Sequence, residues 1–301
     1  MPKLTMPSPK LRRRALLAGL ATFPTAALAT PVPETGLRAA GLPPLPLIPA
    51  QPLADLPAWR RNALPVDPND TRPKIAIVVD DCGVMRDNTA RAVALPGPLT
   101  LAWFPFAPNL AAQTRESRAN GHETLMHMPM QARINDPYAL GPDPLRVDLS
   151  PGVNLERLRD AIAAVPHAVG LNNHMGSVAT RSIWLMNIVA RQTRRSTMLF
   201  LDSVTVAHSE GVLRAEALRV PTAARDVFLD DSPRPGDIAR QLAITEAIAR
   251  HQGYAIAIGH PWPDTLDALE AWLPTLGAKG FALWPIAATV ALRNHLPILA
   301  G

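Results

Sequence analysis

From residue 74 onward, short apolar runs alternate with longer segments in which apolar positions recur every three or four residues. The short runs predict buried strands, and the longer segments predict amphipathic helices. We expect strands at residues 74–80, 99–104, 124–128, 169–172, 198–202, 226–229, 254–259 and 281–284. We expect helices at residues 109–119, 155–165, 182–194, 212–218, 237–251 and 265–276. Near-continuous apolar strands separated by helices indicate a parallel sheet buried on both faces.

This alternation favours a single α/β domain over residues 74–301. Seven or eight strand–helix units in about 220 residues are enough to close a barrel of the TIM type. An open, doubly wound sheet is the alternative that the same pattern allows.

The first 29 residues have the composition of an export signal. Three consecutive arginines at residues 12–14 precede a short apolar stretch at residues 15–23, and the small residues 27–29 offer a cleavage site. The apolar stretch is shorter than the roughly 20 residues that a membrane-spanning helix needs. We therefore expect a periplasmic or otherwise exported protein with no stable membrane span after cleavage. The arginines resemble a twin-arginine signal, and a general secretory signal is the alternative.

Residues 30–73 are rich in Pro and Ala, and 15 of the 33 prolines precede Lys74. This composition predicts an extended linker that has no core of its own, and packing of the segment along the domain surface is the alternative. The charge is also uneven, because the chain up to Pro73 carries nine basic and four acidic residues, whereas the remainder carries 21 of each. A neutral domain without a basic stripe argues against a nucleic-acid partner. The single Cys82 excludes an intramolecular disulfide.

Polar residues end or flank most of the predicted strands. They are Asp80, Asp81, His127, Asn172, Asn173, His174, Asp202, Asp226, Asp230 and His260. Each of them alone has a structural explanation, since an Asp at a strand end often caps the next helix and a lone His is often a hydrogen-bonded core residue. A parallel barrel, however, brings all these strand ends to one face, where catalytic sites lie.

Six segments of the chain resemble the divergent polysaccharide deacetylases, a branch related to the metal-dependent carbohydrate deacetylases of NodB type. They are Ile77-Val-Val-Asp-Asp-Cys-Gly83, Gly121-His-Glu-Thr-Leu-Met-His-Met-Pro-Met130, Gly170-Leu-Asn-Asn-His-Met-Gly-Ser177, Leu201-Asp-Ser203, Arg225-Asp-Val-Phe-Leu-Asp230 and Ile258-Gly-His-Pro261. The resemblance extends from about residue 74 to residue 294. It implies a distorted (β/α) barrel of about seven parallel strands and a metal-dependent hydrolase ancestry.

The resemblance also implies roles for individual residues. Asp80 and Asp81 match the pair in which one aspartate acts as a base and the other binds the metal. His127 matches the first histidine of a His-x-x-x-His motif, but Gln131 stands in place of the second. Asp202 resembles a later catalytic aspartate, and His260 resembles the histidine of the final motif.

His174 is the obvious replacement for the missing histidine, because it follows the next strand on the same face. Asp81, His127 and His174 would then form an open site for a divalent metal, with Zn²⁺ the expected ion. Asp80 would accept a proton from water, and His260, held near Asp202, would protonate a departing amine.

Three further residues are candidates for substrate binding. Trp262 directly follows His260-Pro261 and can stack on a sugar ring. Asn173 either binds substrate or satisfies backbone groups of the barrel. Arg225 either orients a carboxylate of the site or forms a structural ion pair.

The sequence therefore favours an exported metal-dependent hydrolase that removes acyl groups, most plausibly N-acetyl, from an envelope polysaccharide or glycan. A deacetylase-like barrel that has lost catalysis and binds glycan or an envelope partner is the alternative from a different class. A metallo-hydrolase of other esters or amides is a third. The sequence does not specify the sugar, the metal or the oligomeric state.

Overall fold

The computed structural model describes residues 52–133, 140–232, 234 and 236–301. Within these residues eight strands follow the order β6-β5-β4-β3-β2-β1-β8-β7, every pair is parallel, and a further strand, β9, pairs with the start of β1. The strands are β1 (Lys74–Cys82), β2 (Thr100–Trp103), β3 (Glu123–Met130), β4 (Gly170–Met175), β5 (Leu199–Asp202), β6 (Thr222–Ala224), β7 (Val227–Phe228), β8 (Tyr254–Gly259) and β9 (Ala282–Leu283). The helices are α1 (Ala58–Arg61), α2 (Arg86–Ala94), α3 (Leu110–Ala119), α5 (Pro151–Ala164), α6 (Ile183–Arg195), α7 (Gly211–Ala217), α8 (Asp237–Gln252), α9 (Pro263–Trp272) and α10 (Ile286–Arg293).

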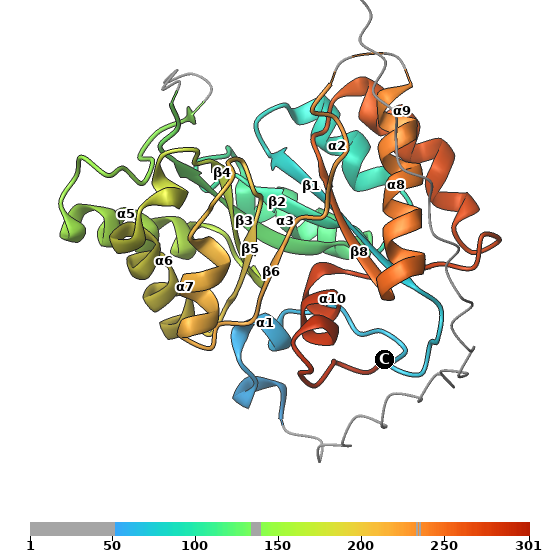
Figure 1. Ribbon diagram of the computed structural model, residues 1–301, viewed down its shortest axis with the longest axis horizontal. Coiled ribbons are helices and arrows are strands. Elements are labelled where there is room, and N and C mark those ends of the chain that lie inside the picture. The colour runs from blue at the N-terminus through green and yellow to red at the C-terminus, as the bar shows by residue number, and fades with distance from the viewer. Residues whose placement is uncertain (1–51, 134–139, 233, 235) are drawn as a thin grey trace, which may run out of the picture. The chain divides into compact units, whose positions relative to one another are not determined.

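The sheet curls into a barrel that is open along one seam. Strands β1 to β6 are neighbours in chain order, and β8 pairs with the other side of β1 and is followed by β7. No pairing joins the two edge strands, β6 and β7, which would otherwise close the circle. Helices α5, α6 and α7 lie against the part of the barrel that contains β3 to β6, at the left of the view, and α2, α8 and α9 lie beside β1 and β8 at the right (Figure 1). The predicted distorted barrel of parallel strands is confirmed, and the doubly wound alternative is excluded by this order.

Alternate strand residues face the interior of the barrel. Ala76 and Val78 of β1, Leu125 of β3 and Ile258 of β8 belong to one buried cluster, which also includes Leu201 of β5. Strands β1 and β5 are not neighbours, so these side chains meet across the interior. Because side chains in a strand alternate with a period of two, the next inward positions toward the carboxyl ends are occupied by polar residues.

Helix α10 closes the amino end of the barrel. Its residues Ile286, Ala287, Val290 and Ala291 pack in the same interior cluster. The buried Glu123 carboxylate anchors the start of this helix, because its Oε2 accepts a hydrogen bond from the Ala287 backbone N–H at 2.9 Å. A carboxylate is favoured at a helix N-terminus by the unpaired N–H groups and the helix dipole.

The segment that precedes β1 packs on this end of the barrel, which corrects the predicted linker boundary. Trp59 is 7% exposed and belongs to the interior cluster, and its backbone N–H donates to the Thr197 carbonyl at 3.0 Å. The Leu64 N–H donates to Glu123 Oε1 at 3.2 Å, and Val66 pairs with Ala300. The expectation that the folded region begins near Lys74 is therefore wrong for the described part of that segment. The predicted export signal and the rest of the linker lie outside the described residues.

The predicted elements correspond to observed ones within a few residues, but four observed elements were not predicted. These are β6, α1, α2 and α10. No helix of the described chain is long and apolar enough to cross a lipid bilayer.

Glu123 makes stability depend on pH. Burial raises the pKa of this carboxyl from 4.5 to about 7, although the Ala287 and Leu64 N–H groups partly oppose the rise. A carboxyl whose pKa is raised by folding stabilises the native state while it is protonated, and this contribution is lost as pH rises from 4.5 through 7. We expect the free energy of unfolding of the wild type to fall relative to that of Glu123→Gln over this range, by on the order of 3 kcal/mol. Urea unfolding of both proteins at several pH values measures the difference, and a difference that does not change with pH would contradict the prediction.

Candidate active site

Two adjacent aspartates at the end of β1 approach the same histidine. In a regular strand their side chains would point to opposite faces, but the pairing of β1 with β2 shifts register between Val79 and Cys82, and Asp81 has φ of 56°. Asp80 Oδ2 lies 3.6 Å from His127 Nε2, and Asp81 Oδ1 lies 3.2 Å from the same nitrogen.

Three of the predicted ligand atoms form a tight triangle. His174 Nδ1 is 3.0 Å from Asp81 Oδ1 and 3.2 Å from His127 Nε2, and the last two atoms are 3.2 Å apart. The register of β3 and β4 explains this proximity, because His127 lies beside Asn172 and His174 follows two residues later on the same face. The structure thus brings Asp81, His127 and His174 together as the sequence predicts.

The donor set fits a divalent metal. Bonds of about 2.05 Å in tetrahedral geometry separate ligand atoms by about 3.3 Å, close to the three observed distances. Asp81 Oδ1 is buried and accepts no well-directed hydrogen bond within the described residues, although two imidazole nitrogens lie beside it. Atoms that point toward a common centre produce this combination of short distances and poor hydrogen-bond geometry. Burial opposes ionisation of Asp81, but the two neighbouring imidazoles outweigh it and hold the pKa of Asp81 below its usual range.

Gln131 does not take the place of the missing histidine. Its Oε1 accepts a hydrogen bond from the Val147 N–H at 2.8 Å, so the side chain fixes the chain after β3 instead of contributing to the triangle. His174 occupies the third corner, as expected.

An asparagine that the sequence reasoning passed over connects this triangle to Asp80. Asn172 is fully buried; its Oδ1 lies 2.8 Å from His127 Nδ1. Its Nδ2 donates to Asp80 Oδ1 at 2.8 Å and to Ser203 Oγ at 3.1 Å. Asp80 is 3% exposed, and its burial raises the pKa of the carboxyl above the ordinary value. Alternate residues of β4 face the interior of the barrel, and this alternation places Asn172 at the level of His127. The alternation is the sequence signal that would have identified Asn172.

His260 reaches the site from the other side and is held by Asp230. His260 Nδ1 lies 2.9 Å from Asp230 Oδ1, and Nε2 lies 4.0 Å from Asp81 Oδ2. Asp230 Oδ2 accepts hydrogen bonds from the His260 N–H at 2.7 Å and from the Thr265 hydroxyl at 2.8 Å. Burial alone would lower the pKa of His260, but the hydrogen bond to Asp230 and the nearby carboxylates raise it to about 9.

The expected pairing of His260 with Asp202 is wrong. Asp202 Oδ1 accepts from the Val204 N–H at 2.9 Å, and its Oδ2 accepts from the Ser209 hydroxyl at 2.6 Å. These bonds fix the chain between β5 and α7. Both Asp202 and Asp230 follow predicted strands, and strand position alone does not distinguish them.

Two of the proposed substrate-binding residues serve the backbone instead. Asn173 accepts a hydrogen bond from the Ser203 N–H at 2.9 Å and donates to the Met175 carbonyl at 2.7 Å. Arg225 donates to the Ser203 and Val204 carbonyls at 2.7 and 3.0 Å. Its guanidinium lies over the Phe228 ring, and among the described residues it makes no ion pair within 4 Å, although the carboxylates of Asp80 and Asp202 are near enough to favour its charge.

Trp262 lies beside the site and is open to solvent. It is 43% exposed and stacks on the His260 ring with centroids 4.7 Å apart. On the opposite side Phe104 is buried and contacts the rings of both His127 and His174. The site is therefore reached from the side of Asp81, His260 and Trp262, whose exposure contrasts with the burial of Phe104. Cys82 is fully buried, and burial raises the pKa of its thiol, which argues against a nucleophilic role.

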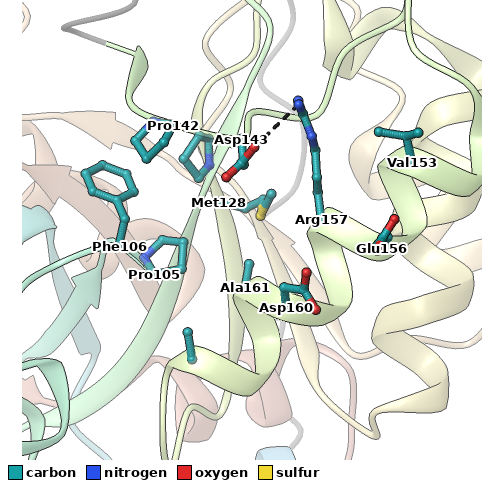
Figure 2. A pocket seen from close by; sticks show the side chains of 12 residues that line it. Pro105, Phe106, Met128, Pro142, Asp143, Val153, Glu156, Arg157, Asp160 and Ala161 are labelled. Carbon is teal, nitrogen blue, oxygen red and sulfur yellow. Dashed lines mark ion pairs between the residues drawn. The ribbon is translucent and has the colours of Figure 1, made fainter.

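A separate cavity of about 390 Å³ lies between the ends of β2 and β3 and helix α5 (Figure 2). Phe106 and Met128 line one side, and Asp143 and Arg157, paired at 3.4 Å, line another. None of the predicted site residues is among the described residues that line this cavity. Phe106 stacks on Phe104, so two aromatic rings separate the cavity from the histidines.

The chain is similar to known proteins over about two thirds of its length. The chain is 36% identical to the uncharacterized protein YibQ of Escherichia coli (strain K12) over 197 residues, which cover 65% of this chain and 61% of that protein. It is 36% identical over 207 residues to an uncharacterized protein of Haemophilus influenzae, with 67% of this chain and 72% of that protein covered. The match thus spans about three fifths of the length of the Escherichia coli relative.

The solved structure of the uncharacterized protein ATU2773 from Agrobacterium tumefaciens C58 has a similar fold. It superposes with a TM-score of 0.74 at 26% identity and covers 78% of this chain and 95% of its own. The divergent polysaccharide deacetylase family matches residues 77–290, which include the aspartates of β1, both triangle histidines and His260. The chain belongs to the divergent polysaccharide deacetylase family.

Proposed function

We propose that this protein is an exported, metal-dependent hydrolase that removes N-acetyl groups from a cell-envelope polysaccharide. The observation that carries the proposal is the triangle of Asp81, His127 and His174, with Asp80 on one side and His260 on the other. Family membership supports a polysaccharide substrate. The open side of the site, next to Trp262, supports an extended ligand that has a sugar ring to stack.

Asp81, His127 and His174 would hold the cation, with Zn²⁺ the best match to two imidazoles and one carboxylate. A divalent cation bound there would polarise the acyl oxygen and lower the pKa of water. Asp80 is the base, because its Oδ2 faces the triangle and burial raises its pKa toward the range in which a carboxylate accepts a proton effectively.

His260 is the acid of the same reaction. Asp230 holds its Nδ1, which leaves Nε2 directed toward Asp81 and the substrate side. As the water oxygen bonds to the acetyl carbon, Asp80 takes the water proton. The carbon–nitrogen bond then breaks, and His260 Nε2 gives its proton to the leaving nitrogen, so that acetate and a sugar amine are released.

A glycan-binding barrel without catalysis is the second candidate. Gln131 favours it, because this residue replaces a histidine of the related deacetylases and is engaged with the backbone of Val147. Binding of N-acetylated glycan without acetate release, by protein that has been loaded with metal, would support this candidate over the hydrolase.

The metal prediction concerns His174. We expect His174→Ala to weaken Zn²⁺ binding by about tenfold or more, because one of three protein ligands is lost. Asp80→Asn should leave the affinity within a few-fold of the wild type, since it removes a base and not a ligand. Isothermal titration with Zn²⁺ measures both variants, and His251→Ala, at an exposed position of α8, is the control for binding to surface histidines. Unchanged affinity in His174→Ala would show that the site is wrongly assigned.

The hydrolysis prediction separates Asp230 from Asp202. We expect the wild type to release acetate from N-acetylated glycan fragments and not from simple acetyl esters. Asp230→Asn should lower kcat by about tenfold or more, because His260 loses the carboxylate that orients and charges it. Asp202→Asn should retain kcat within about threefold, since an amide can preserve the bonds to Val204 and Ser209. The reverse order of effects would restore Asp202 as the catalytic partner.

Export is part of the proposal and rests on residues 1–29, outside the described part of the chain. We expect removal of this segment after Ala29 and recovery of the mature protein from the periplasm. Mass spectrometry of the N-terminus after cell fractionation tests this, and a cytosolic protein that retains Met1 would contradict it.

A further inference from the structure

We propose that Asn172 is a positioning residue, which holds His127 in the tautomer with its proton on Nδ1 and fixes the Asp80 carboxylate beside the triangle. The inference rests on the proposed function for its consequence, but the contacts that support it are independent of any reaction. Asn172 lies on β4, is fully buried, and touches both the proposed base and one of the proposed ligands.

The orientation of the Asn172 amide follows from its neighbours. The nitrogen faces two oxygens, Asp80 Oδ1 at 2.8 Å and Ser203 Oγ at 3.1 Å. The amide nitrogen carries two hydrogens and meets two oxygen atoms, so this orientation gives both hydrogens an acceptor. The flipped amide would turn both hydrogens away from these oxygens and toward the single His127 nitrogen.

The orientation of the amide in turn sets the state of His127. With NH₂ facing Asp80, Asn172 Oδ1 is the atom that lies 2.8 Å from His127 Nδ1. A carbonyl oxygen has no proton to give, so Nδ1 must be the donor. In a neutral imidazole the other nitrogen, Nε2, then carries a lone pair. Nε2 is the atom that lies in the triangle, 3.2 Å from Asp81 Oδ1.

One side chain thus links the base to the ligand. The carboxylate of Asp80 orients Asn172, and Asn172 presents His127 to the cation site in the form that can bind a metal. Ser203, from the end of β5, accepts the second amide hydrogen, so rotation of the amide would leave this hydroxyl and Asp80 without their donor. The sheet reinforces the arrangement, because Asn172 is paired in register with His127 on one side and Leu201 on the other.

Three variants separate positioning from a general structural role. Asn172→Ala removes the acceptor for His127 and the donor to Asp80. Asn172→Asp is isosteric and keeps an oxygen for His127, but it has no donor for Asp80. Asn173→Ala is the matched control, because this neighbouring asparagine is equally buried and hydrogen-bonded but bonds only to Ser203 N, Met175 O and the Thr205 hydroxyl.

The first measurement needs neither metal nor substrate. Two-bond ¹H–¹⁵N correlation spectra of the metal-free protein, recorded at a pH at which His127 is neutral, distinguish the protonated from the unprotonated ring nitrogen of His127. This pH is higher than for an ordinary histidine, because burial opposes a rise in the pKa of His127 but Asp80 and Asp81 outweigh it and raise the pKa. We expect a proton on Nδ1 in the wild type and in Asn173→Ala, and loss of this preference in Asn172→Ala. A wild-type His127 with its proton on Nε2, or an unchanged preference in Asn172→Ala, would overturn the proposal.

The second measurement is Zn²⁺ affinity by isothermal titration. We expect a loss of about tenfold to a hundredfold in Asn172→Ala, and values within a few-fold of the wild type in Asn172→Asp and Asn173→Ala. Asn172→Asp should nevertheless lose acetate release at saturating metal, because two carboxylates then face each other at the base.

If Asn172→Ala does not melt cooperatively, the isosteric Asn172→Asp still decides, since a hundredfold loss of affinity in it would refute the role assigned to the oxygen. A wild-type protein that binds no Zn²⁺ would refute the proposed function, whereas the spectra would still decide the role of Asn172.

Discussion

Two adjacent carboxylates in a largely dehydrated barrel are the constraint around which the rest of the site is organised. Asp80 is 3% exposed, and the side chain of Asp81 is 22% exposed. Buried charges are tolerated only when they are paired, hydrogen-bonded or bound to a cation. The Asn172 amide serves Asp80, and two imidazoles crowd around Asp81. A divalent cation bound among the triangle atoms would offset the negative charge of these two aspartates. This explains why the metal ligands and the base lie close together.

Much of this group could be predicted because a strand alternates with a period of two. Inward apolar residues lead toward polar ones at the carboxyl end, as in Val78 before Asp80, Leu125 before His127 and Ile258 before His260. The sequence therefore identifies the strands and the rim at which chemistry is concentrated. Asp81 breaks the period, and it reaches the site only through the irregular end of β1. Its position at the end of the first strand made it a candidate, and its resemblance to a known motif implied its role as a ligand.

The errors have a common physical origin in contacts between segments that are distant along the chain. Asp202 and Asp230 are equivalent in local pattern, and only the path of the chain after β7 brings Asp230 to His260. The packing of Trp59 was not predicted because the prolines around it favour an extended chain. A Pro-rich sequence does not, however, prevent one aromatic residue from filling a gap at the end of a barrel. Helix α10 was missed for a related reason: apolar on nearly every side, it lacks the polar face by which a surface helix is recognised.

The open seam between β6 and β7 lies at the two edges of the sheet, whereas the strands that carry the site are paired without a break from β4 through β1 and β8 to β7. The triangle and Asp80 come from β1, β3 and β4, where continuous pairing fixes every strand. His260 and Asp230 follow β8 and β7, on the far side of β1. Arg225 lies at the seam; it donates to the chain after β5 and packs over Phe228 of β7, so it connects the two edges that no backbone ladder joins. Phe228 in turn contacts the ring of His260. The distance between the acid and the metal ligands therefore depends on the pairing of β1 with β8, and the Arg225 side chain supports the open edge beside Phe228.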